Sequence, residues 1–159
     1  MQRDDRHVDP TQVDWEIGYL FKVVQTGLHD AMSRALHEVD LTIPLYAALT
    51  ALDQYPEISK ADLARICFVR PQSMTRVMAA LTEGRYVSRV HHPQHGRILQ
   101  TRLTARGRRK LQAATDVIDA LMDNVLDGFS QAERRQFMLM LLRCKDQLGA
   151  GQDRIAHTT

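Results

Sequence analysis

Five polar residues between positions 70 and 76 have side chains that suit hydrogen bonding to the edges of nucleic-acid bases. They are Arg70, Gln72, Ser73, Thr75 and Arg76. Arg can donate two hydrogen bonds to guanine, and Gln can pair in a similar way with adenine. On a helix these residues would face away from Met74, Val77 and Leu81, whose spacing of three and four residues is typical of a buried face. The pattern predicts a helix with a polar edge for base recognition, called the recognition edge below.

The charge of the surrounding stretch also favours nucleic acid as a partner. Residues 57–110 hold twelve Lys or Arg and three acidic residues, a net charge of +9. The rest of the chain holds nine basic and sixteen acidic residues, a net charge of −7, so the overall charge of +2 conceals this separation. A polyanion would meet one basic surface on an otherwise acidic molecule.

Length and motifs exclude several classes of protein. At 159 residues the chain can form one domain or two small subdomains. It has no apolar run near the roughly 20 residues that a membrane span needs, and residues 1–6 lack the apolar core of a signal peptide. We therefore expect a cytoplasmic protein without a membrane partner. Because the chain has no glycine-rich phosphate loop, HExxH motif or GxSxG motif, we expect neither an enzyme nor a bound cofactor.

The cysteines and histidines raise two alternative functions, a redox sensor and a zinc site. Cys67 and Cys144 each lie in a stretch with apolar helical periodicity, which favours two buried thiols over a redox sensor. His91, His92 and His95 raise the possibility of zinc, because imidazole is a common zinc ligand. Adjacent residues at a hairpin tip seldom point the same way, and no Cys or carboxylate lies close in sequence. We expect no metal site, and a polar tip that touches DNA instead.

Apolar periodicity and turn residues predict six helices and one β-hairpin, a mainly α fold. The helices are expected at about 13–39, 42–56, 59–67, 71–83, 104–126 and 131–148, and the strands at 86–90 and 97–103. Expected N-caps are Thr42, Ser59, Thr104 and Ser130, of which Ser59 and Ser130 have an acidic residue three positions later. Gly84 is expected to end the fourth helix.

Two of the predicted helices carry more apolar surface than one small domain can cover. The first would be about 40 Å long at 1.5 Å per residue and has an amphipathic stripe. The last is apolar on much of its circumference, from Phe137 to Leu142. Pairing of two subunits is the simplest way to bury the apolar surfaces of both helices.

The order helix–helix–helix–hairpin in the middle of the chain is the plan of a winged helix-turn-helix, in which the second helix of the pair enters the major groove. The chain also resembles the MarR-type transcriptional regulators from about Trp15 to Leu148. The resemblance rests on four stretches in this order and spacing. They are 41–49 (LTIPLYAAL), Ser73–Arg76 within 70–81, 81–87 (LTEGRYV), and Arg97 six residues before 103–107 (LTARG).

The resemblance implies a homodimer with the element order α-α-α-α-β-β-α-α. Residues 1–40 and 126–159 would form the dimerisation region, joined by the helix at 104–126, and residues 41–104 the winged helix-turn-helix domain. Each domain would enter a major groove, with half-sites about 10 bp apart in a pseudo-palindrome. Arg97 would lie in or near the minor groove. The implied DNA-binding residues are Lys60, Arg70, Gln72, Ser73, Thr75, Arg76, Arg89, His92, Gln94, His95, Arg97 and Arg102, with Lys60, Arg89 and Arg102 on phosphates.

Two positions depart from the family pattern. His95 stands where the family usually has an Asp that orients the wing Arg by an ion pair, and a neutral imidazole cannot do so. The peroxide-sensing branch uses a Cys near the start of the first helix, and this chain has none there.

The resemblance also implies a small aromatic or anionic ligand, bound between the dimerisation helices and the winged domain. The available positions are Trp15, Tyr19, Phe21, His29, Tyr46 and Met122. An aromatic residue at helical spacing is also typical of a core, so a packing role stays open for them. The chain is therefore predicted to be a homodimeric repressor that binds a pseudo-palindromic operator and is released by such a ligand. The alternative is an architectural or adaptor DNA-binding protein without a small-molecule effector.

Overall fold

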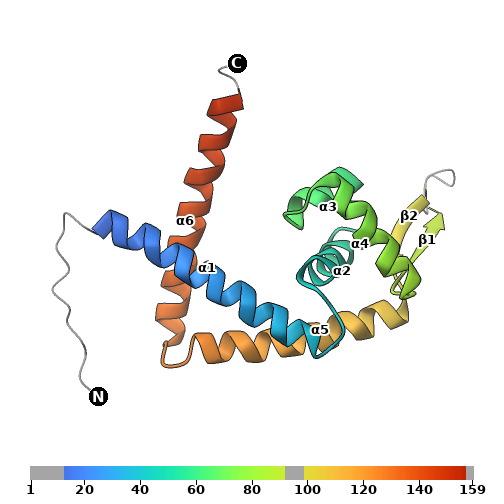
Figure 1. Cartoon of the computed structure of the whole chain (residues 1–159), viewed down its shortest axis with the longest axis horizontal. Helices are drawn as coiled ribbons and strands as arrows, with labels where there is room; N and C mark the ends of the chain where they lie inside the picture. The colour runs from blue at the N-terminus through green and yellow to red at the C-terminus, as the bar shows by residue number, and fades with distance from the viewer. Residues whose placement is uncertain (1–12, 92–98, 157–159) are drawn as a thin grey trace. The chain divides into compact units, whose positions relative to one another are not determined.

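The computed structural model describes residues 13–91 and 99–156. Contacts divide the chain into two compact units, an N-terminal unit of residues 1–121 and a C-terminal unit of residues 122–159. The elements follow the predicted order (Figure 1). They are α1 (Val13–His37), α2 (Ile43–Gln54), α3 (Lys60–Ile66), α4 (Pro71–Glu83), β1 (Val87–His91), β2 (Leu99–Leu103), α5 (Ala105–Val125) and α6 (Gln131–Ala156). The prediction of a mainly helical chain with one hairpin is confirmed.

The core of the N-terminal unit gathers around α2, which contacts α1, α3, α4 and β2. Leu49 of α2 and Met74 and Leu81 of α4 are fully buried. Met74, Val77 and Leu81 form the inner face of α4, as their spacing predicted. Because these side chains occupy one side of α4, its other side is left at the surface.

The two strands form an antiparallel hairpin that begins at Val87 paired with Leu103 and reaches His91 paired with Leu99. Both members of the first pair are buried, so the base of the hairpin is fixed to the core. The predicted turn residues that follow His91 lie outside the described residues.

Three helices end in the same way, with a residue of positive φ directly after the last turn. The N–H of the next residue returns to a carbonyl five positions earlier, which is the Schellman motif. Gly is the usual residue at the left-handed position. In this chain it is Asp40 after α1 (φ 50°), Phe68 after α3 (φ 52°) and Arg85 after α4 (φ 55°).

Gly84 does not supply the left-handed position that ends α4, because its φ is −68° and Arg85 takes that position instead. Gly84 serves a steric purpose, since a Cβ on it would overlap the ring of Tyr86. Tyr86 also limits the start of α5, where a Cβ on Gly107 would overlap the Tyr86 carbonyl oxygen. The turn from α4 to β1 is thus packed tightly on both sides.

Most predicted N-caps are confirmed. Ser59 accepts the Asp62 N–H at 3.1 Å, and Thr104 accepts the Gly107 N–H at 2.9 Å. At α6, Ser130 and Glu133 form a reciprocal capping box, with the Ser130 N–H donating to the Glu133 carboxylate at 2.8 Å. Thr42 precedes α2 as predicted, but its side chain makes no capping hydrogen bond.

The C-terminal unit holds the turn between α5 and α6. Arg134 fixes this turn by donating to the carbonyl of Leu126 at 3.0 Å, the carbonyl of Phe129 at 3.3 Å and the carboxylate of Asp123 at 3.1 Å. Helix α6 continues to Ala156, eight residues beyond its predicted end at Leu148. The glycines beyond that point do not end the helix, because an interior Gly weakens a helix by only about 1 kcal/mol.

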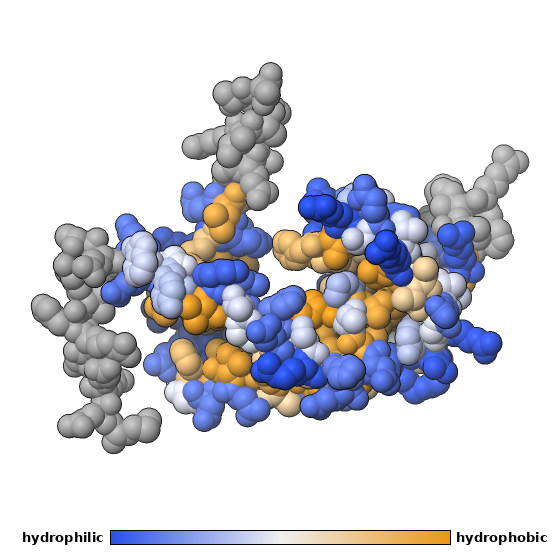
Figure 2. All heavy atoms as spheres, viewed as in Figure 1, coloured by the Kyte–Doolittle hydropathy of each residue, from blue (hydrophilic) through white to orange (hydrophobic). Residues whose placement is uncertain are grey.

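Apolar side chains lie at the surface of both long end helices (Figure 2). From Phe137 to Leu142 every side chain of α6 is 39–53% exposed. On α1, Trp15, Tyr19 and Leu20 are more than half exposed. No helix among the described residues is long and apolar enough to cross a membrane.

Candidate nucleic-acid interface

The recognition edge lies at the surface as the sequence predicted. Gln72, Ser73, Thr75 and Arg76 are exposed on α4, on the side opposite its buried Met74–Val77–Leu81 face. Arg70 is also exposed and occupies the N-cap position directly before Pro71. The edge therefore combines cationic donors, an amide and two hydroxyl groups on the first two turns of one helix, which is the part of a recognition helix that meets base edges.

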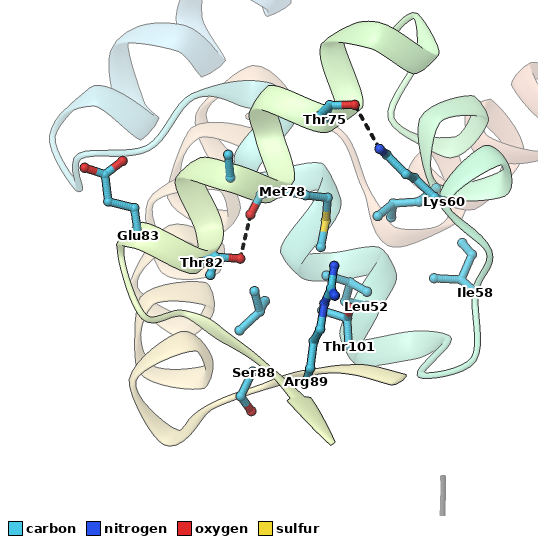
Figure 3. Close-up of a pocket in the computed structure, with 13 residues that line it drawn as sticks. Leu52, Ile58, Lys60, Thr75, Met78, Thr82, Glu83, Ser88, Arg89 and Thr101 are labelled. Atoms are coloured by element: carbon cyan, nitrogen blue, oxygen red, sulfur yellow. Dashed lines mark hydrogen bonds between the residues drawn. The ribbon is translucent and has the colours of Figure 1, made fainter. Parts of the chain in front are cut away.

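Lys60 and Thr75 meet across the two helices of the helix-turn-helix. The Lys60 ammonium donates to the Thr75 hydroxyl at 2.8 Å, so a predicted phosphate contact and a predicted base contact are joined (Figure 3). Thr75 accepts this bond, which leaves its own hydroxyl proton available for a further acceptor. The bond fixes the position of the Lys60 charge beside the recognition edge.

The hairpin holds its two predicted phosphate-binding arginines differently. Arg89 on β1 is exposed, whereas Arg102 on β2 is half-buried. Arg102 donates through Nε and Nη2 to the Gln100 side-chain oxygen at 3.3 and 3.0 Å, and Gln100 donates to Glu57 at 3.2 Å. Gln100 is only 6% exposed. Arg102 is thus tied to Gln100 and Glu57 in a hydrogen-bonded network, while Arg89 is exposed.

Sequence reasoning missed Gln100 and Glu57, the two residues that hold Arg102. No local signal marks them, because a polar residue in a short strand is ordinarily exposed and Glu57 lies 43 positions away. Burial of a polar side chain is tolerated when its hydrogen bonds are made, and Gln100 makes bonds on both its oxygen and its nitrogen. The network therefore depends on tertiary packing that the sequence pattern does not contain.

A cavity of about 690 Å³ lies beside the recognition helix, between α2, α3, α4 and the hairpin (Figure 3). Its apolar wall includes Leu52, Leu63, Met78 and Val87, and its polar rim includes Lys60, Thr75, Thr82, Ser88, Arg89 and Thr101. Figure 3 shows Arg89 extending from β1 into the space below α4, and the Glu83 carboxylate turned away from it. Two cations above an apolar wall suit a small molecule with an apolar body and a negative group.

The six residues predicted to bind a ligand lie elsewhere. Trp15, Tyr19, Phe21 and His29 are exposed on α1, where the rings of Trp15 and Tyr19 stack at 5.6 Å. Tyr46 is half-buried on α2, and Met122 is half-buried in the C-terminal unit. All six belong to the described part of the chain, and none lines the cavity beside α4.

Four of the predicted DNA contacts lie outside the described residues. They are His92, Gln94, His95 and Arg97. The zinc alternative rests partly on the same segment. Elsewhere, within residues 13–91 and 99–156, no three His, Cys, Asp or Glu side chains gather in a way that could hold a metal ion.

The two cysteines differ from each other, which corrects the prediction of two buried thiols. Cys67 is buried, and its burial raises the pKa of the thiol. Cys144 is exposed on α6. Its helix is apolar around much of its circumference, so apolar spacing alone did not identify which side of the helix is covered.

Comparison with known proteins supports the interpretation of this surface. The model of the MarR family matches residues 39–98. The HTH-type transcriptional repressor Rv2887 of Mycobacterium tuberculosis is 37% identical over 128 residues, which are 80% of this chain and 92% of that protein. The crystal structure of Rv2887 with DNA has a TM-score of 0.66 and 34% identity, and covers 80% of this chain and 95% of that one. The structure of Rv2887 with salicylic acid has a TM-score of 0.69 and 36% identity, with 80% and 94% covered.

Proposed function

This chain belongs to the MarR family of transcriptional regulators, and we propose that it is a homodimeric repressor which binds a pseudo-palindromic operator and releases it when a small aromatic or anionic ligand binds. The observation that carries this proposal is the exposed recognition edge on α4, opposite a buried apolar face. A repressor of this kind acts where the chromosome is, so we also propose a cytoplasmic location.

The proposed DNA contacts fall into two groups. Arg70, Gln72, Ser73, Thr75 and Arg76 would meet base edges in the major groove, where side-chain hydrogen bonds carry sequence information. Lys60 and Arg89, which both line the cavity beside the recognition helix, would contact phosphates, which positions the domain without specifying sequence. Arg102 is a less direct candidate, because Gln100 already accepts two hydrogen bonds from its guanidinium.

The proposed dimer would cover the apolar surfaces of α1 and α6. On this proposal residues 1–40 and 126–159 form the dimerisation region, residues 41–104 the winged helix-turn-helix domain, and the helix at 104–126 joins them. Side chains such as Trp15, Phe137 and Met138 are 43–73% exposed in the single chain. Burying an apolar side chain contributes about 1.5–3 kcal/mol when it is complete, so a stretch of such residues favours association.

We propose that the cavity beside α4 binds the effector. Rv2887 has been solved with salicylic acid, a small aromatic carboxylate. In this chain the carboxylate of a similar molecule would meet Arg89 and Lys60, and its ring would meet the apolar wall formed by residues such as Leu52 and Met78. Because Arg89 and Lys60 are also the proposed phosphate contacts, ligand and DNA would compete for the same charges. The six residues of the sequence prediction remain candidates for a separate ligand site.

The first test is selection of an operator from random DNA duplexes, followed by gel shift with salicylate as the probe ligand. A ligand-responsive repressor should select one palindromic sequence and release it as salicylate is added. An architectural or adaptor protein should bind many sequences about equally and show no release. Equal binding to all duplexes would refute the proposed function.

The second test measures salicylate binding without DNA, by calorimetry. Arg89→Ala should weaken salicylate binding at least about tenfold, because the charge pair is lost from a partly enclosed site. Arg109→Ala is the matched control, since it removes an exposed cation of α5 that does not line this cavity. Equal affinity of the Arg89 and Arg109 variants would contradict the effector site.

A further inference from the structure

Phe68 is an aromatic residue that the folded chain leaves almost entirely in water. Its side chain is 97% exposed, the highest value among the exposed large apolar residues of the described chain. It therefore adds almost no buried apolar area to the core. Among residues 13–91 and 99–156, no side chain covers the Phe68 ring, so the folded chain gains almost nothing from its apolar area.

The backbone of Phe68 is also strained. With φ 52° it occupies the left-handed position of the Schellman motif that ends α3. Asp40, at the equivalent position after α1, has a short polar side chain that tolerates this conformation, but an aromatic residue does not. Gly would relieve the strain without loss of any core contact. A strained residue that contributes no packing indicates a role outside the folded chain itself.

The position of Phe68 points to DNA. It lies two residues before the N-cap Arg70, at the entrance to the recognition helix, and Arg70 is itself exposed. The turn is fixed on both sides, because the Val69 N–H bonds to the Ala64 carbonyl at 3.0 Å and the Phe68 N–H to the Arg65 carbonyl at 3.1 Å. The backbone that carries the aromatic ring is thus held in place next to the start of the recognition edge.

We propose that Phe68 is a further specificity-determining residue of the DNA site and contacts the methyl group of a thymine in the operator. This inference rests on the proposed function. The thymine methyl is the apolar group that base pairs present in the major groove, and Phe is among the side chains that contact it. An apolar protein surface is a poorer occupant, since it would have to desolvate the charge of Arg70, whereas a polyanion pairs with that charge.

The test uses the full chain and an operator selected with the wild-type protein. Phe68→Gly should lower operator affinity at least about tenfold and leave binding to unrelated duplexes unchanged. Its midpoint of thermal unfolding should be no lower than that of the wild type, which separates the effect from a folding defect. Phe68→Leu, which keeps an apolar side chain, should retain most of the affinity. Asp40→Gly is the matched control at an equivalent backbone position and should bind the operator normally.

A second measurement identifies the contact on the DNA. Replacing single thymines of the operator by uracil removes one methyl group at a time. At one position per half-site this should weaken wild-type binding about fourfold, the effect of one buried methyl group, and leave Phe68→Gly unaffected. Unchanged operator affinity of Phe68→Gly, or uracil effects that are equal in both proteins, would overturn the inference while leaving the repressor intact. Failure of the wild-type protein to select any operator would overturn the proposed function, and this inference with it.

Discussion

The junction between the hairpin and α5 permits a sharp test of the fold, through Gly107→Ala. Gly107 lies in the first turn of α5, and a Cβ on it would overlap the carbonyl oxygen of Tyr86. That oxygen belongs to the backbone, so no side-chain rotation can move it away. It also accepts hydrogen bonds from the Thr104 N–H at 2.9 Å and the Thr104 hydroxyl at 3.2 Å. Any shift that makes room for Ala must disturb these bonds.

The expected loss of stability has two parts. Forcing an extra carbon into a packed site costs about 1–3 kcal/mol, and each weakened hydrogen bond costs about 0.5–1.5 kcal/mol. With two such bonds weakened, the parts add up to a loss of about 2–6 kcal/mol. Domains of this kind are stable by only about 5–15 kcal/mol, and each kcal/mol moves the unfolding midpoint by about 2–4 °C. The midpoint should therefore fall by about 10 °C.

The assay is thermal unfolding at one fixed protein concentration, because a dimer unfolds with a concentration-dependent midpoint. Arg109→Ala is the control, since Arg109 is exposed on the same helix and lies outside the proposed dimerisation region. Its stability should stay within about 0.5 kcal/mol of the wild type, as is usual for an exposed residue. A Gly107→Ala variant with a wild-type midpoint would show that α5 does not begin against Tyr86 as described.

Three further predictions concern the DNA site and a buried thiol. Arg76→Ala should lose about 1–3 kcal/mol of binding at one operator position and relax specificity there; equal weakening on every sequence, measured by competition gel shift, would contradict a base contact. Operator affinity should fall steeply with salt in a fluorescence titration, because each phosphate contact releases counterions; a nearly flat slope would count against Lys60 and Arg89 as phosphate contacts. Burial raises the pKa of the Cys67 thiol above its ordinary value, so the unfolded thiol ionises first as the pH rises. The free energy of unfolding should therefore decline above about pH 9, and urea titrations should show a smaller decline in Cys67→Ala.

The recognition edge could be predicted from sequence because every signal for it is local. The apolar spacing of Met74, Val77 and Leu81 fixes which side of α4 is buried, and the intervening polar residues must then face outward. The capping boxes at Ser59 and Ser130 are local for the same reason, since each joins residues three positions apart. Such features survive any tertiary arrangement that buries the same helix face.

The environment of the arginines could not be predicted, because it depends on residues that are distant in sequence. Arg89 and Arg102 are alike as cations on a two-stranded hairpin, yet only Arg102 is held by the side chain of Gln100. The exposure of Cys144 could not be predicted either, because it depends on what covers α6 and not on the spacing of apolar residues along the helix. The length of α6 is a third feature that the sequence did not predict. The helix extends beyond Leu148 because it continues through glycine and meets no proline that would end it.

The placement of glycine at the end of α4 shows how two local requirements compete. A Schellman motif favours Gly at the left-handed position, yet the chain has Arg85 there and places Gly84 one residue earlier. A non-glycine residue in the left-handed region costs about 1–2 kcal/mol, which a folded domain can tolerate. A Cβ on Gly84 would instead overlap the Tyr86 ring, and that ring also lies beneath the cations of Arg106 and Lys110, at 5.5 and 5.8 Å from its centre. Displacing the ring would disturb the junction of hairpin and α5, so steric fit outweighs backbone strain at this point. Phe68 has the same backbone strain as Arg85, but no close packing at that position explains it. This difference is the reason for proposing that the Phe68 side chain contacts DNA.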